Sequence, residues 1–334
     1  MSTDNLIDVR DLSRVFDVSK PWLNRLIERD EKQFLKAVTE VSFAMRKGET
    51  FALVGESGSG KSTVAKMVVG LLQPTQGDIT IAGVDMTDPS AKADMRQLRR
   101  RIQMIFQDPY ASLNPRWRVE KIIAEPLLAF GIAKTSTEVT QQVGELLSLV
   151  GLDPRDGTKF PHEFSGGQRQ RICIARSLAS KPEFIVCDEP TSALDVSVQA
   201  QILNLMRDLQ DEFELTYLFI SHDLAVVRHM ATRIGVMYLG RVVEIAPAAD
   251  LFATPKHPYT RMLLDAVPDL EMSGRPRVPV KGEIPNPINP PTGCAFHPRC
   301  PLANDRCKAE IPVAAEAGSA TVACHAVEEG RHLD

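Results

Sequence analysis

The sequence predicts an α/β fold followed by a small C-terminal region rich in proline and cysteine. Buried strands are indicated by five short apolar runs, at residues 51–54, 102–106, 184–187, 217–220 and 234–238. The first run is followed by a glycine-rich turn and a helical pattern, which is the order of elements in α/β folds. After residue 247 prolines become frequent, and this tail lacks the apolar content for a core of its own.

Two further strands are predicted near the start of the chain, where alternation appears at residues 6–10 and 37–45. Between them lies an insert, residues 17–36, with a helical pattern that begins near Ser19. Its apolar side chains would share one helix face: Trp22, Leu23, Leu26 and Ile27. We expect this face to pack on its own domain, and the alternative is a helix that faces a membrane or a partner.

The segment at residues 121–151 is mostly helical in pattern and interrupts the α/β alternation. We interpret it as part of an inserted helical subdomain that covers about residues 110–165. The chain contains no internal repeat, which indicates one copy of the fold in its 334 residues. A division into a large domain, residues 1–250, and a smaller C-terminal region, residues 251–334, is expected for this length.

Composition excludes several classes of function. The net charge of −4 gives no overall basic field, so nucleic-acid binding is not expected. The first residues lack a signal-peptide pattern, and no apolar run reaches the length of a transmembrane helix, so we expect a cytoplasmic chain. In that reducing compartment the six cysteines would be buried thiols or metal ligands and not disulfides.

Residues 55–62 read GESGSGKS and match the phosphate-binding pattern G-x-x-x-x-G-K-[ST]. The loop follows a predicted strand and precedes a predicted helix, which is the context that the motif requires. Backbone N–H groups would surround phosphate oxygens at the positive end of that helix. Lys61 would reach the β and γ phosphates, and the Ser62 hydroxyl would ligate Mg²⁺. The predicted ATP-binding residues are Gly55, Glu56, Ser57, Gly58, Ser59, Gly60, Lys61, Ser62 and Thr63.

Polar side chains end three of the predicted strands. Asp188 and Glu189 follow residues 184–187, and neighbouring strand residues point to opposite sides, so the two carboxylates have different roles. Asp188 is expected to lie beside Mg²⁺, and Glu189 is expected to act as the general base for an attacking water. His222 and Gln107 would lie at the same rim, His222 beside phosphate and water and Gln107 in contact with Mg²⁺ or water.

A second anion-binding helix start is predicted at residues 164–168, which read FSGGQ and precede a helix. The Ser165 hydroxyl and the first N–H groups of that helix would face an anion. Within one chain this turn would lie too far from the nucleotide of Lys61 to serve it.

Together these motifs resemble the ABC (ATP-binding cassette) ATPases over about residues 6–250. The resemblance implies a RecA-like core with an N-terminal antiparallel β subdomain and the inserted helical subdomain. It also implies that two subunits sandwich two ATP molecules, with Glu189, His222 and Gln107 catalytic and Gln107, Asp188 and Ser62 near Mg²⁺. The residues that would contact the ATP of the partner subunit are Ser165, Gly166, Gly167, Gln168 and Asp195. Phe16 matches the aromatic residue that stacks on adenine.

A narrower resemblance covers nearly the whole chain. Residues 105–116, 257–260 and 285–294 are similar to those of the ATPase subunits of bacterial dipeptide/oligopeptide importers, in particular the dipeptide "F"-type subunit. This resemblance implies a peripheral protein on the cytoplasmic face of the inner membrane. Its partners would be a paralogous second ATPase, two transmembrane permeases and, indirectly, a periplasmic solute-binding protein.

The C-terminal cysteines Cys294, Cys300, Cys307 and Cys324 lack the tight C-x₂-C spacing of a zinc ribbon. The tail has no core of its own, so a metal bound by four cysteine thiolates would hold it together. Spacing alone does not exclude a mixed Cys/His zinc site. The importer resemblance implies a [4Fe-4S] cluster in preference to Zn²⁺. Cys173 and Cys187 lie in apolar contexts and are expected to be core residues.

The expected function is therefore an ATP-hydrolysing subunit that powers the import of di- or oligopeptides. Alternatives within the same motor role are import of a nickel chelate or an oligosaccharide. More distant alternatives are an exporter ATPase, a soluble ABC ATPase that acts on DNA or ribosomes, and an iron–sulfur regulatory protein that holds ATP without turnover. The last would be favoured if a Glu189→Gln variant hydrolysed ATP as fast as the wild type.

Overall fold

The computed structural model describes residues 5–22, 25, 31–88, 92–266 and 282–331. The chain divides into two compact units. The first contains residues 81–220 and short earlier segments, and the second contains residues 7–44, 51–80 and the chain from residue 221 onward. Each unit is described by itself.

Three parallel strands form the sheet of the first unit: β6 (Ile102–Ile105), β7 (Phe184–Asp188) and β8 (Thr216–Ser221). Ile102 pairs with Phe184, and Phe184 pairs with Thr216, so the strands end at a common edge. Every residue of β7 and β8 is buried, as apolar parallel strands require. The predicted strands at these positions are confirmed. Helices α3 (Lys92–Arg101) and α8 (Val196–Phe213) and the short β5 (Val84–Asp85) belong to this unit.

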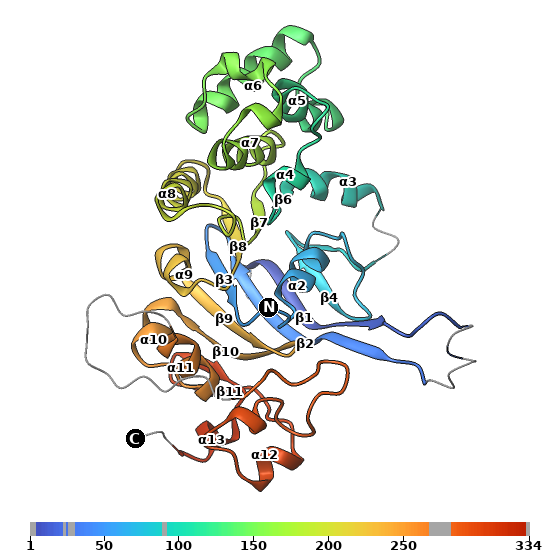
Figure 1. Cartoon of the computed structure of the whole chain (residues 1–334). Helices are drawn as coiled ribbons and strands as arrows, with labels where there is room; N and C mark the ends of the chain where they lie inside the picture. The colour runs from blue at the N-terminus through green and yellow to red at the C-terminus, as the bar shows by residue number, and fades with distance from the viewer. Residues whose placement is uncertain (1–4, 23–24, 26–30, 89–91, 267–281, 332–334) are drawn as a thin grey trace. The chain divides into compact units, whose positions relative to one another are not determined.

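The predicted insert at about residues 110–165 is helical in the first unit. It contains α4 (Pro109–Ser112), α5 (Val119–Ala129), α6 (Ser136–Leu149), η1 (Pro154–Thr158) and η2 (Pro161–Glu163), and α7 (Gly166–Leu178) follows it. Figure 1 shows α5, α6 and α7 close together in green. Helix α6 starts sharply because Thr135 and Glu138 form a capping box, in which each side chain accepts a hydrogen bond from the other residue's backbone N–H.

The second unit contains β3 (Thr50–Val54), which is parallel to β9 (Arg233–Tyr238), and β10 (Arg241–Pro247), which is antiparallel to β9. Both predicted strands, residues 51–54 and 234–238, are confirmed. Helix α2 (Lys61–Val68) follows β3, and α9 (Leu224–Met230), α10 (Ala248–Ala253) and α11 (Pro258–Asp265) come later in the chain. In this part of the unit a turn at residues 55–60 links β3 directly to α2.

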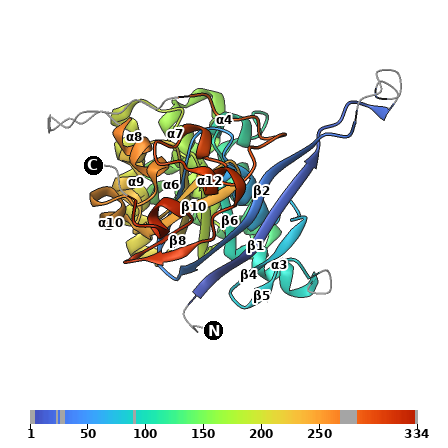
Figure 2. The same ribbon diagram turned by 90° about the horizontal axis from the view of Figure 1, so that it is seen from below.

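The N-terminal strands of the second unit lie in the order β2 (Phe34–Arg46), β1 (Asn5–Asp17) and β4 (Gln76–Ile81), as Figure 2 shows in blue and cyan. The insert between β1 and β2 continues the pairing, because the Val18 N–H donates to the Gln33 carbonyl at 3.0 Å. Trp22 is 71% exposed, so the expectation that it packs on its own domain is wrong for this side chain. Leu23, Leu26 and Ile27 lie outside the described residues.

The C-terminal segment of the second unit extends a sheet. Strand β12 (Ala320–Val322) pairs antiparallel with β10 and with β11 (Ala315–Ala317). The segment also contains η3 (His297–Arg299), α12 (Asp305–Ala309) and α13 (His325–Glu328). The buried Phe296 ring contacts Tyr238 and Tyr259 at centroid distances of 5.3 and 5.4 Å, so this segment shares its core with β9 and α11.

Among the helices of the described residues, none combines the length and apolar character needed to cross a bilayer.

Candidate nucleotide site

The turn between β3 and α2 has the geometry of a phosphate-binding loop. Gly55 and Gly60 have φ values of +151° and +103°, and a Cβ atom there would lie 2.2 Å from the Met237 carbonyl oxygen and 2.4 Å from that of Ala37. Both positions therefore require glycine. No side chain caps the start of α2, so the positive end of this helix faces the loop without a competing carboxylate or hydroxyl.

Lys61 folds back over this loop. Its Nζ donates to the carbonyl oxygens of Gly55 and Glu56 at 2.8 and 2.9 Å, and it lies 3.3 Å from the Ser59 Oγ. The residue is only 5% exposed. The carbonyl contacts hold the ammonium group beside the glycine-rich loop, and a cation in this place can bind phosphate oxygens.

In the first unit, the structure brings Gln107 and Glu189 together. The Gln107 Nε2 donates to the Glu189 Oε2 at 2.9 Å, from positions just after the ends of β6 and β7. Both residues were predicted to lie at this rim because parallel strands that end together present their next residues to one edge.

Asp188 and Glu189 have different environments. Asp188 is the last residue of β7 and is 5% exposed. Glu189 has a φ of +46°, which is rare for a residue other than glycine, and its N–H donates to the Ile220 carbonyl at 3.0 Å. This backbone conformation turns the chain directly after Asp188, a form of strain that is common at functional sites. His222 directly follows the last residue of β8.

The predicted second helix start is the N-terminus of α7. Ser165 is the N-cap, its Oγ accepts from the Gln168 N–H at 3.3 Å, and the Gln168 side chain accepts from the Ser165 N–H at 3.0 Å. A Cβ at Gly167 would lie 2.4 Å from the Val198 Cγ1, so the close packing of α7 on α8 excludes any larger residue. Ser165, Gly166 and Gln168 are exposed.

Two more predicted nucleotide contacts have local structural partners. Asp195 is the N-cap of α8, where it accepts from the Val198 N–H at 3.0 Å, and that hydrogen bond lowers the pKa of its carboxyl. The Phe16 ring is half-buried, and the Arg14 guanidinium lies 4.7 Å from its centroid.

The four C-terminal cysteines are buried or half-buried, and all are free thiols. Burial and the neighbouring thiols raise the pKa of Cys294 to about 11 and that of Cys300 to about 12, and burial also raises the pKa of Cys324. The Cys294 N–H donates to the Cys307 carbonyl at 2.8 Å. Within the described residues, however, no three His, Cys, Asp or Glu side chains are arranged closely enough to hold a metal ion. Cys173 and Cys187 are buried, as expected for core residues.

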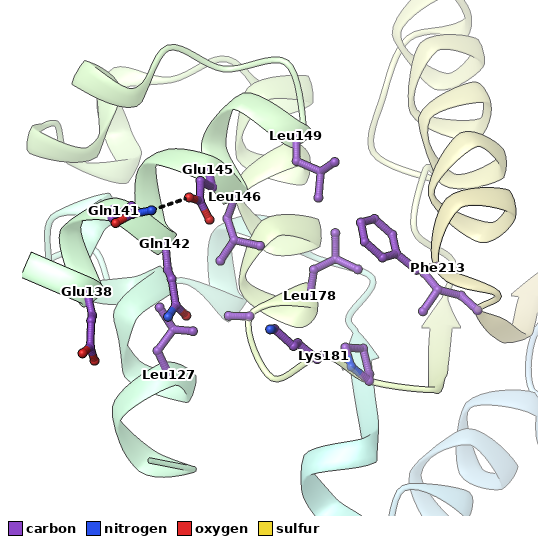
Figure 3. Close-up of a pocket in the computed structure, with 13 residues that line it drawn as sticks. Leu127, Glu138, Gln141, Gln142, Glu145, Leu146, Leu149, Leu178, Lys181 and Phe213 are labelled. Carbon is purple, nitrogen blue, oxygen red and sulfur yellow. Dashed lines mark hydrogen bonds between the residues drawn. The ribbon is translucent and has the colours of Figure 1, made fainter. Parts of the chain in front are cut away.

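A separate cavity of about 600 Å³ lies among α5, α6, α7 and the end of α8 (Figure 3). Its walls are largely apolar, with Leu127, Leu146 and Phe213 pointing toward it, and Gln141 and Glu145 are hydrogen-bonded to each other at 2.9 Å. None of the predicted nucleotide residues lines this cavity.

The sequence did not indicate that Tyr259 and Arg299 contact the phosphate loop. Tyr259 Oη accepts from the Glu56 N–H at 3.0 Å, and Arg299 forms two hydrogen bonds with the Glu56 carboxylate. These partners lie 203 and 243 residues away along the chain. The similarity of residues 257–260 to the importer family was the only signal that touched either of them.

The phosphate loop, the strand-end carboxylates and the helical insert with its SGGQ turn define an ATP-hydrolysing cassette of the ABC type, and comparisons with known proteins agree. Residues 38–192 match the profile described as "ABC transporter", and residues 243–307 match "Oligopeptide/dipeptide transporter, C-terminal region". A post-hydrolysis ADP- and Pi-bound dimer of the cassette MJ0796 is 26% identical, with a TM-score of 0.62 over 72% of this chain and 98% of that chain. CbiO1 from Clostridium perfringens, part of an ABC transporter complex, is 25% identical, with a TM-score of 0.61 over 75% and 92%.

Curated relatives place the chain more narrowly. The oligopeptide transport ATP-binding protein AppF of Bacillus subtilis is 49% identical over 96% of this chain and 97% of its own length. The di/tripeptide transport ATP-binding protein DppF of Pseudomonas aeruginosa is 47% identical over 98% and 99%. The chain belongs to the oligopeptide/dipeptide branch of the ABC transporter ATP-binding proteins, and it is an ATPase.

Proposed function

We propose that this chain hydrolyses ATP to power the import of di- or oligopeptides through a bacterial membrane transporter. The observation that carries the proposal is the near-full-length similarity to peptide transport ATP-binding proteins, combined with a complete set of nucleotide motifs on the expected elements. The chain would act at the cytoplasmic face of the inner membrane with two permeases, a paralogous second ATPase and, indirectly, a periplasmic binding protein. Residues 1–250 would be the ATPase domain and residues 251–334 the family's C-terminal region.

ATP would bind to the loop at residues 55–62. Lys61, already held over the loop carbonyls, would reach the β and γ phosphates, and N–H groups of the loop and of α2 would donate hydrogen bonds to other phosphate oxygens. Phe16 would stack on the adenine. The Ser62 hydroxyl, the Asp188 carboxylate and the Gln107 carbonyl supply oxygen atoms, which are the ligands that Mg²⁺ prefers. Mg²⁺, when bound, would neutralise phosphate charge.

Glu189 would accept a proton from the attacking water. Its hydrogen bond from Gln107 and its fixed backbone orient the carboxylate before any nucleotide arrives, which reduces the reorganisation needed in the transition state. His222, after β8, would contact the γ-phosphate and the water.

The α7 helix start would act on a neighbouring subunit. Ser165, Gly166 and Gln168 are exposed at the positive end of a 13-residue helix, which suits a triphosphate, and Gly167 would contribute its backbone there. Asp195, at the start of α8, would contact the same nucleotide. Closure of the two subunits on two ATP molecules would be transmitted through the helical insert to the permeases.

The function is tested by transport in proteoliposomes that contain this chain, its second ATPase and both permeases. We expect ATP-dependent uptake of a labelled dipeptide, and we expect Glu189→Gln to retain ATP binding but lose at least about a hundredfold in hydrolysis. Uptake of a nickel chelate or an oligosaccharide but no peptide would contradict the substrate class. Unchanged hydrolysis by Glu189→Gln would contradict the assigned base.

We propose in addition that Cys294, Cys300, Cys307 and Cys324 hold a structural metal centre, a [4Fe-4S] cluster in preference to Zn²⁺. The proposal is supported by the four soft ligands in one segment and by the hydrogen bond from the Cys294 N–H to the Cys307 carbonyl at 2.8 Å, although the side chains would have to move closer together to ligate. Anaerobically purified protein should contain about four iron atoms and absorb near 400 nm, and Cys300→Ser should remove both signals, with Cys173→Ser as the control. One zinc atom would support the alternative, and a metal-free protein would contradict both.

A further inference from the structure

Glu56, the second residue of the phosphate loop, is held from three sides. Its carbonyl oxygen accepts from the Lys61 Nζ at 2.9 Å, and its N–H donates to the Tyr259 Oη at 3.0 Å. Its carboxylate accepts from the Arg299 Nη1 and Nη2 at 2.7 and 3.0 Å. Two of these three partners come from the part of the chain after residue 250.

The Arg299 side chain is buried, and its backbone is fixed beside Glu56. Its side chain is only 2% exposed, against 24% for that of Glu56, and its guanidinium also lies 5.7 Å from the centroid of the Tyr238 ring. The backbone turn of η3 fixes it, since the Arg299 N–H donates to the Phe296 carbonyl at 3.0 Å and Phe296 is buried among Tyr238, Tyr259 and His257. A buried guanidinium in a two-point contact keeps a carboxylate charged and in one orientation.

The negative charge of Glu56 is unusual in a loop that would bind a negatively charged triphosphate. Glu56 is the only acidic residue at positions 55–62, a loop that would receive a triphosphate of about four negative charges. An unpaired carboxylate in the loop would repel the nucleotide, because two like charges in a partly buried site are only weakly screened by water. Arg299 cancels this charge and directs the carboxylate toward the C-terminal segment.

We propose that Arg299 is a positioning residue for ATP binding, which neutralises Glu56 and fixes the entrance of the phosphate loop. The inference rests on the proposed role of residues 55–62 in holding the triphosphate. On this inference Arg299 and Tyr259, which both come after residue 250, contribute to the affinity of the loop for ATP. We expect the effect in ATP binding and not in the chemical step, because the carboxylate that Arg299 holds belongs to the loop that would receive the triphosphate.

The test is a double-mutant cycle on the full-length chain, with Kd for ATP measured by titration calorimetry. Arg299→Met should raise the Kd about tenfold, and in a Glu56→Gln background the same change should raise it less than about twofold. Arg299→Lys keeps the charge but loses the two-point contact, so its Kd for ATP should lie between those of the wild type and Arg299→Met. In the assembled transporter the increase should appear in KM for ATP, with kcat changed less than about twofold.

Two controls separate this inference from other effects. Arg306→Met removes another arginine of the same segment, one that pairs with Glu310, Glu328 and Glu329 and is 35% exposed, and it should leave the Kd unchanged. Lys61→Ala tests the loop itself: tight ATP binding by that variant would contradict the proposed role of residues 55–62 and, with it, the premise of this inference. Loss of ATP binding by Lys61→Ala without an effect of Arg299→Met would overturn the inference alone. An equal effect of Arg299→Met in both Glu56 backgrounds, or a loss confined to kcat, would overturn the inference.

Discussion

His257 is a buried side chain whose protonation state is set by packing. The residue is 1% exposed, and its Nδ1 accepts from the Tyr259 N–H at 3.0 Å at the start of α11. Burial lowers the pKa of the imidazole from 6.5 to about 3. The neighbouring Glu244 carboxylate is occupied by the backbone N–H groups of Lys256 and His257. The folded protein therefore keeps His257 neutral over the whole physiological range.

This residue predicts a dependence of stability on pH. Between pH 6.5 and about 3 the unfolded chain binds a proton on His257 that the folded chain does not, so acidification favours unfolding. The free energy of unfolding should fall by up to about 1.4 kcal/mol per pH unit from this group alone. Urea unfolding at several pH values between 7 and 4.5 measures this slope.

His257→Asn provides the comparison, since asparagine can still cap α11 but does not titrate. The wild type should lose stability more steeply than the variant as the pH falls below 6.5. Parallel curves for the two proteins would mean that His257 does not carry this effect.

At the scale of elements, strand β12 joins the C-terminal segment to the ATPase sheet. Its residues alternate between buried and exposed, with Val322 3% exposed and Thr321 facing solvent, and Glu244 of β10 pairs with Val322. The strand covers an edge of β10 that would otherwise present unpaired backbone groups. The C-terminal segment is thus connected to the sheet by backbone hydrogen bonds as well as by side chains.

A charge placed on the buried side of β12 should separate this segment from the sheet. Val322→Asp should destabilise the protein by about 2–4 kcal/mol, because an unpaired carboxylate would be buried. Thr321→Asp, the adjacent exposed position, should cost less than about 0.5 kcal/mol. Thermal unfolding and limited proteolysis of the C-terminal segment measure both, and equal effects of the two changes would contradict this account of β12.

The sequence was most informative where a short pattern determines an element. Apolar runs predicted β3, β7, β8 and β9 because buried parallel strands have no polar face, and the run at β6 was found although Gln103 and Met104 are only half-buried. The glycine pattern predicted the phosphate loop. The family resemblance then assigned roles to the other motifs. The exposure of Trp22 was harder to predict, because the local sequence of an insert does not show whether an apolar side chain is buried.

Contacts between distant parts of the chain could not be predicted from local patterns. Gly167 was assigned to an anion site, but its lack of a side chain is also required by the approach of Val198 from α8. Arg299 and Tyr259 reach Glu56 only because the C-terminal segment folds onto β9 and α11. A single arginine in a proline-rich tail carries no local signal for such a contact.

For the molecule as a whole, the contacts of Glu56 connect the order of synthesis to the nucleotide loop. The motif at residues 55–62 leaves the ribosome early, but its partners Tyr259 and Arg299 are translated about 200 and 240 residues later. The Glu56 carboxylate and N–H cannot reach their final partners while the chain is still being made. A nascent cassette therefore carries an unfinished phosphate loop until Arg299 has emerged, so the loop could bind ATP in its final form only after the segment around residue 299 has folded.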